Sequence, residues 1–418
     1  MKKLYFYLSI LLMLFSTFIQ SQTTKEEFFS DIKHASGVYQ PYIYVNTPVT
    51  QVPEGYKPFY ISHYGRHGSR WLDSPESYTN PQNILIEAHK AGKLTAFGES
   101  LYERVNIIAT DAEGRYGDVS HLGIIEHKGI AERMYGSFPE VFSTKNGRKC
   151  YIYSRSTVVP RCILSMAANN ERLKELNPEI NIEREAAKKY NYLNNSYKHP
   201  KRDSVNTVSK NFIAQHFDVK RFMASVFNDT VYTNEYIKDP VSFVSEIYYL
   251  AADIEDVAHL KLSMSDVFSK DDLFILWQAS NIKLYNVFTS KAAVDSSKKL
   301  LKNILDCADN AIKSNNISAD LRFGHDSYIA PLLALMEING ANSIETNPEK
   351  VYLVWSDFKV TPMGVNLQLI FYKNAITGEV IVKLLHNEKE TEIPITSDIA
   401  PYYYWKDFKT YYENKLTE

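Results

Sequence analysis

The chain has 418 residues, of which 44% are hydrophobic and 23% are charged, as in an ordinary globular protein. This composition excludes an intrinsically disordered chain and a protein with many membrane spans. At roughly 100 to 200 residues per domain, the length predicts two or three domains, or one large α/β domain with an insertion. The formal net charge of -2 gives no overall attraction to nucleic acid, so any site for an anion must be local.

The N-terminus has the pattern of a cleaved export signal. Lysines precede an apolar run over residues 4–19, and the small residue Ser21 follows it. The run falls short of the roughly 20 apolar residues that a spanning helix needs, so an uncleaved membrane anchor is the less favoured alternative. We predict that residues 1–21 are a signal peptide and that the mature chain, from Gln22, is periplasmic or secreted.

Three cysteines, Cys150, Cys162 and Cys307, are too few and too scattered for a disulfide framework. Their odd number leaves at least one thiol unpaired, so we expect buried thiols with at most one bridge. The sequence contains no CxxC pair and no Cys/His cluster with the spacing of metal ligands. We therefore expect no thiolate metal site.

The first elements that the sequence predicts are a short helix over residues 25–32 and a strand over residues 59–63. Proline and glycine bound this strand on its upstream side, and Gly65 and Gly68 follow it. A strand that runs into a glycine-containing turn is where α/β folds place their sites. The turn after residue 63 is therefore the first candidate for a functional site.

The same order of strand, loop and helix recurs further along the chain. Residues 121–138 have helical periodicity, and a second short strand over residues 150–153 leads into a long helical pattern over residues 161–176. Alternating strands and helices of this kind favour an α/β fold.

Residues 177–318 differ in character from the rest of the chain. Charged helical segments such as 241–257 and 272–288 follow one another there, with no clear strand among them. We predict that this region is a helical cap domain inserted into the α/β core.

The chain then returns to strand-like sequence. We predict a strand over residues 351–355 and a hairpin that pairs residues 367–372 with residues 380–385. Early and late segments are then expected to share one sheet. The predicted α/β core therefore comprises residues 22–176 together with residues 319–418.

The turn after the first strand carries two guanidiniums around an imidazole: Arg66, His67 and Arg70 stand among the glycines Gly65 and Gly68. A protonated imidazole would be unfavourable there, so the arginines should lower the pKa of His67 and keep a nucleophilic nitrogen available. Phosphate suits this cluster, because its oxygens accept paired N–H groups and its phosphorus can be attacked in line. The alternative is a surface loop whose charges are satisfied by carboxylates.

Two further segments favour the phosphate site. His325 and Asp326 stand directly before an apolar helical run over residues 329–336, at a junction between loop and helix. The N-terminus of a helix is a favourable place for a phosphate. A third guanidinium, Arg161, follows the second strand and begins a helix.

At these motifs the chain resembles the histidine acid phosphatases, branch 2 of the histidine phosphatase superfamily. Residues 66–70 are similar to the N-terminal RHGxR signature of that family, with His67 in the position of the nucleophile. His325 and Asp326 resemble its distal His-Asp motif. The motifs follow the order of the family, and they cover most of the mature chain.

Two segments between these motifs extend the resemblance. Residues 122–134 are similar to a glycine-marked helix of the family, and residues 155–165 resemble the segment that supplies its third phosphate-binding arginine. We carry that role over to Arg161 rather than to Arg155.

The resemblance implies an α/β fold with a mainly parallel central sheet flanked by helices, like that of phosphoglycerate mutase, and an inserted helical cap. It also implies a two-step hydrolysis without a metal or another cofactor. Neutral His67 attacks a phosphomonoester, Asp326 protonates the departing alkoxide, and water then hydrolyses the phosphohistidine. The residues that hold the phosphate oxygens in this scheme are Arg66, Arg70, Arg161 and His325.

The resemblance leaves the substrate open. Arg161-Cys162 and the tyrosine-rich tail over residues 401–412 look closest to the multiple inositol polyphosphate phosphatases, which degrade phytate. That subfamily usually has His-Ala-Glu where this chain has His325-Asp326, and Leu72 stands in place of a usual proline. Inositol polyphosphates are the favoured substrates, and the alternative is a sugar-phosphate or broad-specificity acid phosphatase.

A basic stretch over residues 188–202 contains no acidic residue. If it faces the site, Lys188 and Lys189 are candidates for contacts with extra phosphates of the substrate. The alternative is an ordinary solvated loop, and tyrosines among the lysines give only weak support for nucleic acid. Two other functions stay open: a phosphate-binding protein that lacks catalysis, and a phosphotransferase with an acceptor other than water.

The spacing of His63 and His67 is also compatible with the hypothesis of a zinc site, since histidines four residues apart on a helix can share a metal. Gly65 and Gly68 oppose a helix at this place. We therefore expect His63 to be a packed residue near the end of the strand.

Overall fold

The computed structural model describes residues 24–193, 202–314, 316–338 and 340–418. The predicted signal peptide, residues 1–21, lies outside the described residues. None of the helices within the described ranges is long and apolar enough to cross a membrane.

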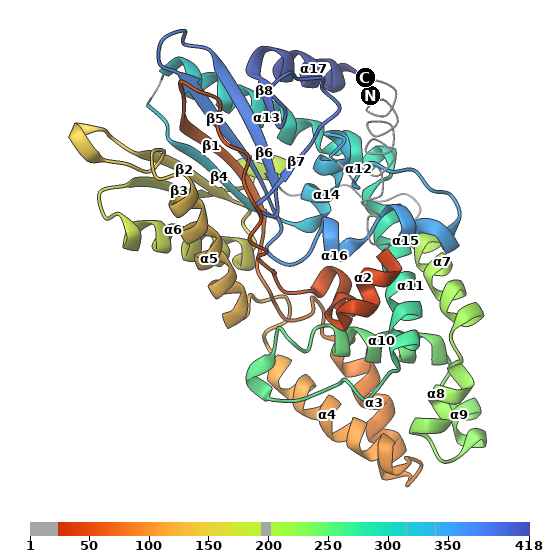
Figure 1. The fold of residues 1–418 in the computed structure, drawn as a ribbon. Helices are drawn as coiled ribbons and strands as arrows, with labels where there is room; N and C mark the ends of the chain where they lie inside the picture. The colour runs from red at the N-terminus through yellow and green to blue at the C-terminus, as the bar shows by residue number, and fades with distance from the viewer. Residues whose placement is uncertain (1–23, 194–201, 315, 339) are drawn as a thin grey trace, which may run out of the picture.

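The centre of the molecule is a sheet in the order β3-β2-β4-β1-β5-β6-β7, with β8 beside β6 (Figure 1). Its strands are β1 Tyr56–Arg66, β2 Tyr151–Ser156, β3 Asn181–Ala186, β4 Ala319–Gly324, β5 Asn366–Asn374, β6 Val380–His386, β7 Lys389–Thr391 and β8 Tyr402–Tyr404. The half formed by β3, β2, β4 and β1 is parallel, and the half formed by β5 to β8 is antiparallel. The α/β class, the hairpin and the sheet shared by early and late segments are confirmed.

The register of the parallel half brings three strand ends together. Arg66 at the end of β1 stands opposite Gly324 at the end of β4, and Ser156 at the end of β2 stands opposite Phe323. Loops that follow the carboxyl ends of neighbouring parallel strands meet at one edge of the sheet. The segments after β1, β2 and β4 therefore lie close together in space.

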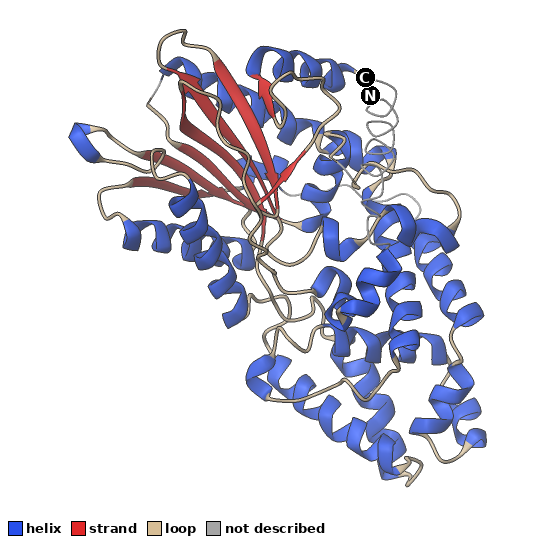
Figure 2. Cartoon of the chain, viewed as in Figure 1, coloured by secondary structure: helices blue, strands red, loops and turns tan. Residues whose placement is uncertain are grey.

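Helices cover both faces of this sheet (Figure 1, Figure 2). They are α5 His121–Ser137 and α6 Pro160–Leu176 on one face, and α13 Lys298–Ser314, α14 Asp326–Leu335 and α17 Trp405–Thr417 on the other. Side chains of β1 alternate between the faces: Ile61 packs in a cluster with Met134 and Met166, and Tyr64 packs in a cluster with Leu300. Each such buried apolar side chain stabilises the fold by roughly 1.5–3 kcal/mol.

A second group of helices gathers at the end of the molecule remote from the sheet (Figure 1). It includes α3 Glu76–Lys90, α4 Ala96–Ala112, α8 Val219–Val226, α9 Thr230–Tyr236 and α10 Pro240–Ala252. Helix α3 packs against α4 and α10, and α4 packs against α8, so helices that precede β2 join helices from the predicted cap. The division of the chain into an α/β core and a cap over residues 177–318 stays a prediction.

The remaining elements of the described chain are helices and 3-10 turns. They are α2 Thr24–Ser30, η1 Ile32–Tyr39, η2 Lys145–Gly147, η3 Lys188–Leu193, α7 Arg202–His216, η4 Ala258–Leu260, α11 Lys270–Phe288, α12 Lys291–Ser296, η5 Pro348–Lys350, α15 Val351–Val354 and α16 Asp357–Val360. Helix α11 packs against both α7 and η1, which ties the start of the described chain to the helical region.

The prediction of a strand over residues 351–355 is wrong, because this segment begins with helix α15. Val351 and Trp355 are buried while the residues between them are exposed or half-buried, and Trp355 N donates to Val351 O at 2.9 Å. Burial every fourth residue is the helical period. A short apolar run does not by itself distinguish a helix from a strand, and the preceding turn η5, which begins at Pro348, starts a helix here.

The prediction that residues 177–318 contain no strand is also wrong, because β3 lies at one edge of the sheet. Its sequence is polar, as an exposed edge strand tolerates. Strand β4 was not predicted either, although it lies in the middle of the sheet with every residue buried. Its charged residues Asp320 and Arg322 obscured the strand pattern, and both are buried with polar partners. Asp320 accepts from Tyr60 Oη at 2.8 Å and pairs with Arg155 at 2.5 Å, while Arg322 donates to Asn303 Oδ1 at 2.9 Å.

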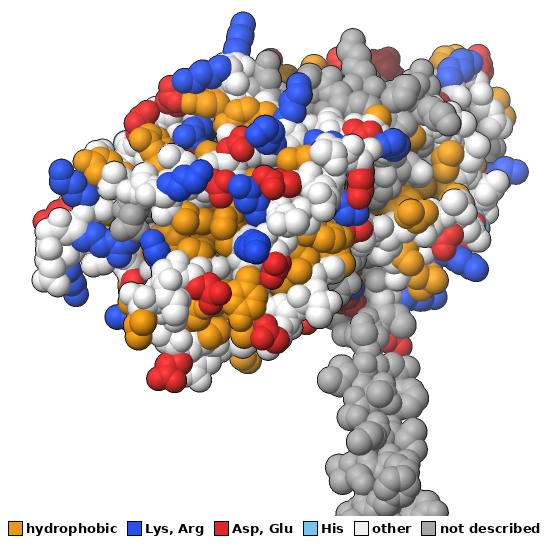
Figure 3. All heavy atoms as spheres, turned by 90° about the horizontal axis from the view of Figure 1, so that it is seen from above, with side chains coloured by type: hydrophobic (Ala, Val, Ile, Leu, Met, Phe, Trp, Pro, Cys, Tyr) orange, Lys and Arg blue, Asp and Glu red, His pale blue; other side chains and the backbone are white. Residues whose placement is uncertain are grey.

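Charges of both signs are mixed on the surface. On the face seen in Figure 3, lysine and arginine side chains are interspersed with aspartate, glutamate and apolar groups. The coloured residues of that view form no continuous basic tract, in keeping with the near balance of 47 basic and 49 acidic residues.

Candidate active site

The turn after β1 is held by its own backbone. Four consecutive N–H groups, from residue 66 to residue 69, donate hydrogen bonds of 2.9, 3.0, 3.1 and 2.7 Å. Their acceptors are, in order, Val365 O, Gly324 O, Ser165 Oγ and Glu126 Oε2. These acceptors come from β4, α5, α6 and the segment before β5, so the turn is fixed from several sides.

Two glycines allow helix α5 to approach this turn closely. A Cβ atom on Gly68 would lie 2.4 Å from Gly123 O, and a Cβ atom on Gly123 would lie 2.4 Å from Ser69 O. Neither backbone atom can move aside as a flexible side chain would. Gly68 in the RHGxR-like turn and Gly123 in the helix over residues 121–138 therefore both permit the close contact between the turn and α5.

The hydrogen bond of His67 fixes its tautomer. Nδ1 lies 2.9 Å from Gly68 O, and a carbonyl oxygen can only accept a hydrogen bond. Nδ1 therefore carries the proton in the neutral ring, which leaves the lone pair on Nε2. Nε2 is the ring nitrogen available for attack.

The surroundings keep His67 neutral. Its side chain is buried, and burial together with the charges of Arg66, Arg70 and Arg161 lowers the pKa of His67 well below its usual value. The lowering of the pKa by neighbouring arginines follows the expectation from the sequence, and burial is the larger cause. A neutral imidazole at any working pH is what a nucleophilic nitrogen requires.

Arg66 is clamped by main-chain carbonyls. Nη1 donates to Val38 O at 2.6 Å and to Thr361 O at 2.8 Å, while Nη2 forms an ion pair with Asp326 Oδ2 at 3.1 Å. Nε is buried and has no hydrogen-bond partner within the described ranges. The guanidinium is thus held through Nη1 and Nη2, and its Nε–H group is left to donate a hydrogen bond to a ligand.

Asp357, which the sequence analysis did not single out, fixes the two residues whose carbonyls clamp Arg66. Its Oδ2 accepts from Val38 N at 3.0 Å, and its main-chain oxygen accepts from Thr361 N at 2.7 Å. Its Oδ1 accepts from Trp277 Nε1 at 2.8 Å. Burial raises the pKa of Asp357 to about 6, against the lowering effect of these hydrogen bonds.

Arg70 and Arg161 meet at one carboxylate. Arg70 Nη2 lies 2.9 Å from Asp73 Oδ2, and Arg161 Nη2 lies 3.5 Å from Asp73 Oδ1. The Nε atoms of both arginines are buried and without hydrogen-bond partners in the described part of the chain. Arg161 is the second residue of α6, at the helix start that the sequence predicted.

His325 and Asp326 occupy the N-terminus of α14, as the sequence predicted. His325 is the residue before the first turn, and Asp326 is the first residue of the helix. His325 Nε2 lies 3.4 Å from Thr157 Oγ1 and 3.6 Å from Cys162 Sγ, and the ring centroids of His67 and His325 are 5.7 Å apart. The six residues predicted for the site therefore lie in one cluster.

Charges around α14 set the protonation of its first residues. Burial, and then Arg161, lower the pKa of His325 to about 4. Burial acts to raise the pKa of Asp326, but Arg66, Arg70 and His325 together bring it below the ordinary value. Without a bound anion, Asp326 is thus a carboxylate paired with Arg66.

Glu126 and His127 on α5 support the turn from behind, and the sequence did not single them out. Glu126 Oε1 accepts from Ser69 Oγ at 2.8 Å, and burial raises the pKa of Glu126. His127 Nε2 donates to Arg66 O at 3.0 Å, and burial lowers the pKa of His127 to about 4. Their neighbouring positions on a glycine-marked helix were the only signal in the sequence.

The remaining candidates from the sequence lie outside this cluster. Lys188 is exposed, and Lys189 is paired with Glu185 at 2.8 Å. Their contact with substrate stays a prediction. His63 lies on β1 rather than on a helix, packs 5.4 Å from the ring of Phe323, and has its pKa lowered to about 3 by burial. The described residues contain no group of His, Cys, Asp and Glu arranged to hold a metal.

All three cysteines are free thiols. Cys150 and Cys162 are buried, as predicted, and Cys307 is half-buried. Burial raises the pKa of Cys162 to about 11, so the sulfur beside His325 is a neutral thiol.

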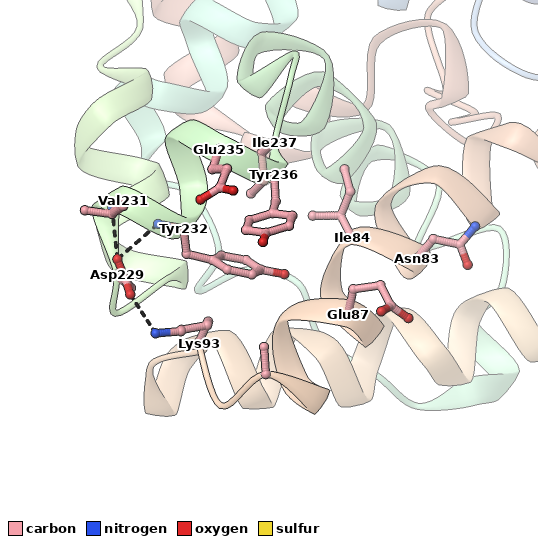
Figure 4. A pocket seen from close by; sticks show the side chains of 11 residues that line it. Asn83, Ile84, Glu87, Lys93, Asp229, Val231, Tyr232, Glu235, Tyr236 and Ile237 are labelled. Carbon is pink, nitrogen blue, oxygen red and sulfur yellow. Dashed lines mark hydrogen bonds and ion pairs between the residues drawn. The ribbon is translucent and has the colours of Figure 1, made fainter.

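A pocket in the helical region is lined by tyrosines and carboxylates rather than by arginines (Figure 4). It lies between α3 and α9, where the rings of Tyr232 and Tyr236 stack at 4.8 Å and face Glu87 across the opening. Glu235 also lines it, and Lys93 is paired with Asp229 at 2.6 Å. Its carboxylates disfavour a phosphate, so this pocket is no substitute for the arginine cluster.

Comparison with known proteins gives matches among solved structures only. No family model matches the chain, and no curated protein sequence matches it. The multiple inositol polyphosphate phosphatase of Bifidobacterium longum, in complex with inositol hexasulfate, matches with a TM-score of 0.75 at 17% identity, over 92% of this chain and 98% of that chain.

Two phytases match as well. The phytase from D. castellii has a TM-score of 0.67 at 15% identity, over 92% of this chain and 85% of that chain. Hafnia alvei phytase has a TM-score of 0.52 at 12% identity, over 88% of this chain and 98% of that chain. At such identities the likeness concerns the fold: the chain has the α/β fold of these phosphatases, as the resemblance of its motifs implied.

Proposed function

We propose that the protein is an exported histidine acid phosphatase that hydrolyses phosphomonoesters through a phosphohistidine at His67. One observation carries the proposal: His67 presents an unprotonated Nε2 inside a cluster of three guanidiniums that keep unpaired N–H groups. Such a cluster binds a phosphate and directs a nucleophile at its phosphorus. The order of the motifs in the chain and the fold shared with solved phosphatases support the same reaction.

In the first step, His67 Nε2 attacks the phosphorus of the bound ester. The N–P bond forms while the bond between phosphorus and the ester oxygen breaks, and Asp326 gives its proton to the departing oxygen. The guanidiniums of Arg66, Arg70 and Arg161 and the ring of His325 hold the three phosphate oxygens, whose charge is spread in the transition state.

In the second step, water attacks the phosphorus of the phosphohistidine. The Asp326 carboxylate takes a proton from this water, the N–P bond breaks, and inorganic phosphate and neutral His67 are formed. No electron transfer is involved, and the protons balance over the two steps.

The acid needs substrate to become protonated. In the unliganded site, Arg66 helps to hold the pKa of Asp326 below its usual value. A bound phosphate accepts from Arg66 and adds negative charge beside the carboxyl group, which raises the pKa of Asp326. The protonated form is still favoured by acid, so we expect turnover to be highest at mildly acidic pH.

Inositol polyphosphates are the favoured substrates in this proposal, and sugar phosphates are the second candidate. The solved relative from Bifidobacterium longum binds inositol hexasulfate, an anion with the shape of phytate, and two further relatives are phytases. The arginine cluster itself suits the phosphate group of either substrate class.

The test is phosphate release by the mature chain, residues 22–418, from phytate, glucose 1-phosphate and an aryl phosphate between pH 3 and 8. A chelator is present throughout. We expect chelator-resistant release that falls by roughly a thousandfold or more in His67→Ala, because the nucleophile is gone. His89→Ala is the matched control, since His89 is a half-exposed residue at the end of α3 paired with Glu99.

The outcomes separate the alternatives. No release from any substrate by a folded protein that binds phosphate would identify a phosphate-binding protein without catalysis. Equal activity in His67→Ala and in the wild type would contradict the histidine mechanism. The order of the substrates chooses between a phytase and a sugar phosphatase.

A further inference from the structure

Asp73 lies between two arginines of the proposed site. Its two carboxylate oxygens take different partners, Arg70 Nη2 at 2.9 Å and Arg161 Nη2 at 3.5 Å. The side chain of Arg70 is 5% exposed, whereas that of Asp73 is 56% exposed. A half-exposed carboxylate thus bridges two guanidiniums, one of them buried, that the proposed function assigns to the substrate phosphate.

The backbone fixes Asp73 at this place. Trp71 N donates to Asp118 O at 3.1 Å, and Gly117 N donates to Leu72 O at 2.9 Å, so the two segments run side by side. Gly117 has φ +75°, and a Cβ atom there would lie 3.1 Å from Arg161 Nη1 and 3.2 Å from Asp73 Oδ1. A glycine at 117 therefore leaves the room in which the carboxylate meets Arg161.

The charges at the site divide into two sets. Arg66 is offset by Asp326, and the pair of Arg70 and Arg161 is offset by Asp73. Burial acts to lower the pKa of Arg70, and Asp73 is the charge that does most to raise it. A phosphate bound by Arg70 and Arg161 would accept hydrogen bonds from the guanidiniums that Asp73 now faces.

We propose that Asp73 is an internal counter-ion that occupies Arg70 and Arg161 in the free protein and is displaced by the phosphate of the substrate. This inference rests on the proposed function, because it takes the two arginines as ligands of that phosphate. Asp73 then lowers the affinity for every phosphate ester, since its ion pairs must be broken when substrate binds.

Asp73 is suited to displacement. The side chain of Asp73 is 56% exposed, so water screens its ion pairs and can replace them when the carboxylate leaves. A phosphate dianion carries more charge than a carboxylate and accepts paired N–H groups from arginine. The displaced carboxylate remains attached to the same turn, next to the bound phosphate.

The position of Asp73 also bears on selectivity. A negative charge beside the bound phosphate disfavours further phosphates on the same substrate more than it disfavours a neutral sugar ring. Asp73 therefore selects against densely phosphorylated esters, and its removal should favour phytate over glucose 1-phosphate.

The experiment uses the full mature chain and inorganic phosphate as the probe. Asp73→Asn keeps the shape of the side chain and removes its charge, and Glu76→Gln removes the same charge from an exposed position at the start of α3. By calorimetry we expect phosphate to bind about threefold to tenfold more tightly to Asp73→Asn, and with unchanged affinity to Glu76→Gln.

Steady-state kinetics complete the test. We expect Asp73→Asn to lower KM for phytate more than KM for glucose 1-phosphate, while kcat stays within about twofold of the wild type. Phosphate affinity that is unchanged or weaker in Asp73→Asn would overturn the proposal, and a fall in kcat at constant KM would instead make Asp73 a positioning residue.

The two proposals fail in different ways. Calorimetry needs no turnover, so tighter phosphate binding by Asp73→Asn supports the counter-ion even if the wild type releases no phosphate. If wild-type activity depends on His67 but phosphate affinity does not respond to Asp73→Asn, only the counter-ion is wrong.

Discussion

The turn after β1 and the turn after β4 end at the same edge of the sheet, yet they are held in different ways. In the first turn, the backbone N–H groups of residues 66 to 69 all donate to fixed acceptors. In the second turn, Asp326 begins a helix with a side chain that is 23% exposed and paired with Arg66. His67 is therefore fixed in place, while Asp326 can change its partner and its protonation.

This difference matches the tasks that the two turns have in the proposed reaction. A nucleophile gains from a fixed position, since small displacements from the line of attack are costly in rate. A group that first gives and then takes a proton must exist in two charge states, which a rigid, fully paired carboxylate resists. Substitutions in the turn after β1 should thus slow the reaction by displacing His67. Substitutions in the turn after β4 should slow it by altering proton transfer.

The largest effect is expected from Asp326→Asn, which removes the proton donor and keeps the shape of the side chain. Turnover of alkyl phosphates should fall about 10²-fold to 10⁴-fold, because the leaving alkoxide then departs without a proton. Turnover of an aryl phosphate with an acidic phenol should fall less, since that phenolate needs no proton. The measurement is kcat/KM on both substrates, which reports on the first step and not on the later attack of water, and equal losses in kcat/KM on the two would contradict the role of Asp326 as the acid.

An intermediate effect is expected from Asp357→Asn, which weakens the hold on Arg66. Burial raises the pKa of Asp357 in the folded protein to about 6, above its value of 3.8 in an unfolded chain. The folded state thus binds this proton more tightly, and the wild type loses stability as pH rises from about 4 to above 6. The variant lacks this titration.

The free energy of unfolding, measured by urea from pH 4 to 7.5, tests this point. Asp357→Asn should be destabilising by roughly 1–3 kcal/mol at pH 4, where an acceptor of buried N–H groups is lost. The deficit should shrink by up to about 3 kcal/mol towards pH 7.5, at 1.36 kcal/mol per pKa unit. The control Asp407→Asn changes an exposed residue of α17 and should leave the pH profile unchanged. A deficit that grows with pH would contradict the raised pKa.

The smallest effect is expected from His63→Leu. His63 is buried, and neither ring nitrogen has a hydrogen-bond partner among the described residues. An apolar side chain of similar volume should change the free energy of unfolding by less than about 1.5 kcal/mol. Phosphate release should stay within about twofold of the wild type, with or without a chelator. A large loss of activity would contradict this expectation and favour the alternative in which His63 is a metal ligand.

Residue type and local position were enough to predict which residues of the candidate site lie together, while their roles stay a prediction. His67, His325, Asp326 and the arginines stand directly after strands or at helix starts, and the structure gathers them into one cluster. Asp357 and Asp73 could not be found in this way. Asp357 accepts from Val38, 319 residues away in the chain, and only the folded structure brings such groups together.

The fold was predicted least well where the local pattern conflicts with the tertiary context. Strand β4 contains Asp320 and Arg322, which are buried only because Tyr60, Arg155 and Asn303 satisfy them. The apolar pattern of residues 351–354 is compatible with a strand or a helix, and only the burial of Val351 and Trp355 shows the helical period. The helical patterns over residues 121–138 and 161–176 were strong enough to predict their elements directly.

The most direct test of the account is to trap the intermediate. Mature protein is mixed with an aryl phosphate at acidic pH, quenched with alkali within milliseconds, and digested for mass spectrometry. We expect one phosphoryl group on Nε2 of His67, no such group in His67→Ala, and more of it in Asp326→Asn if water attack is slowed more than its formation. A phosphoryl group on another residue, or turnover by the wild type with His67 unmodified at every time point, would contradict the account.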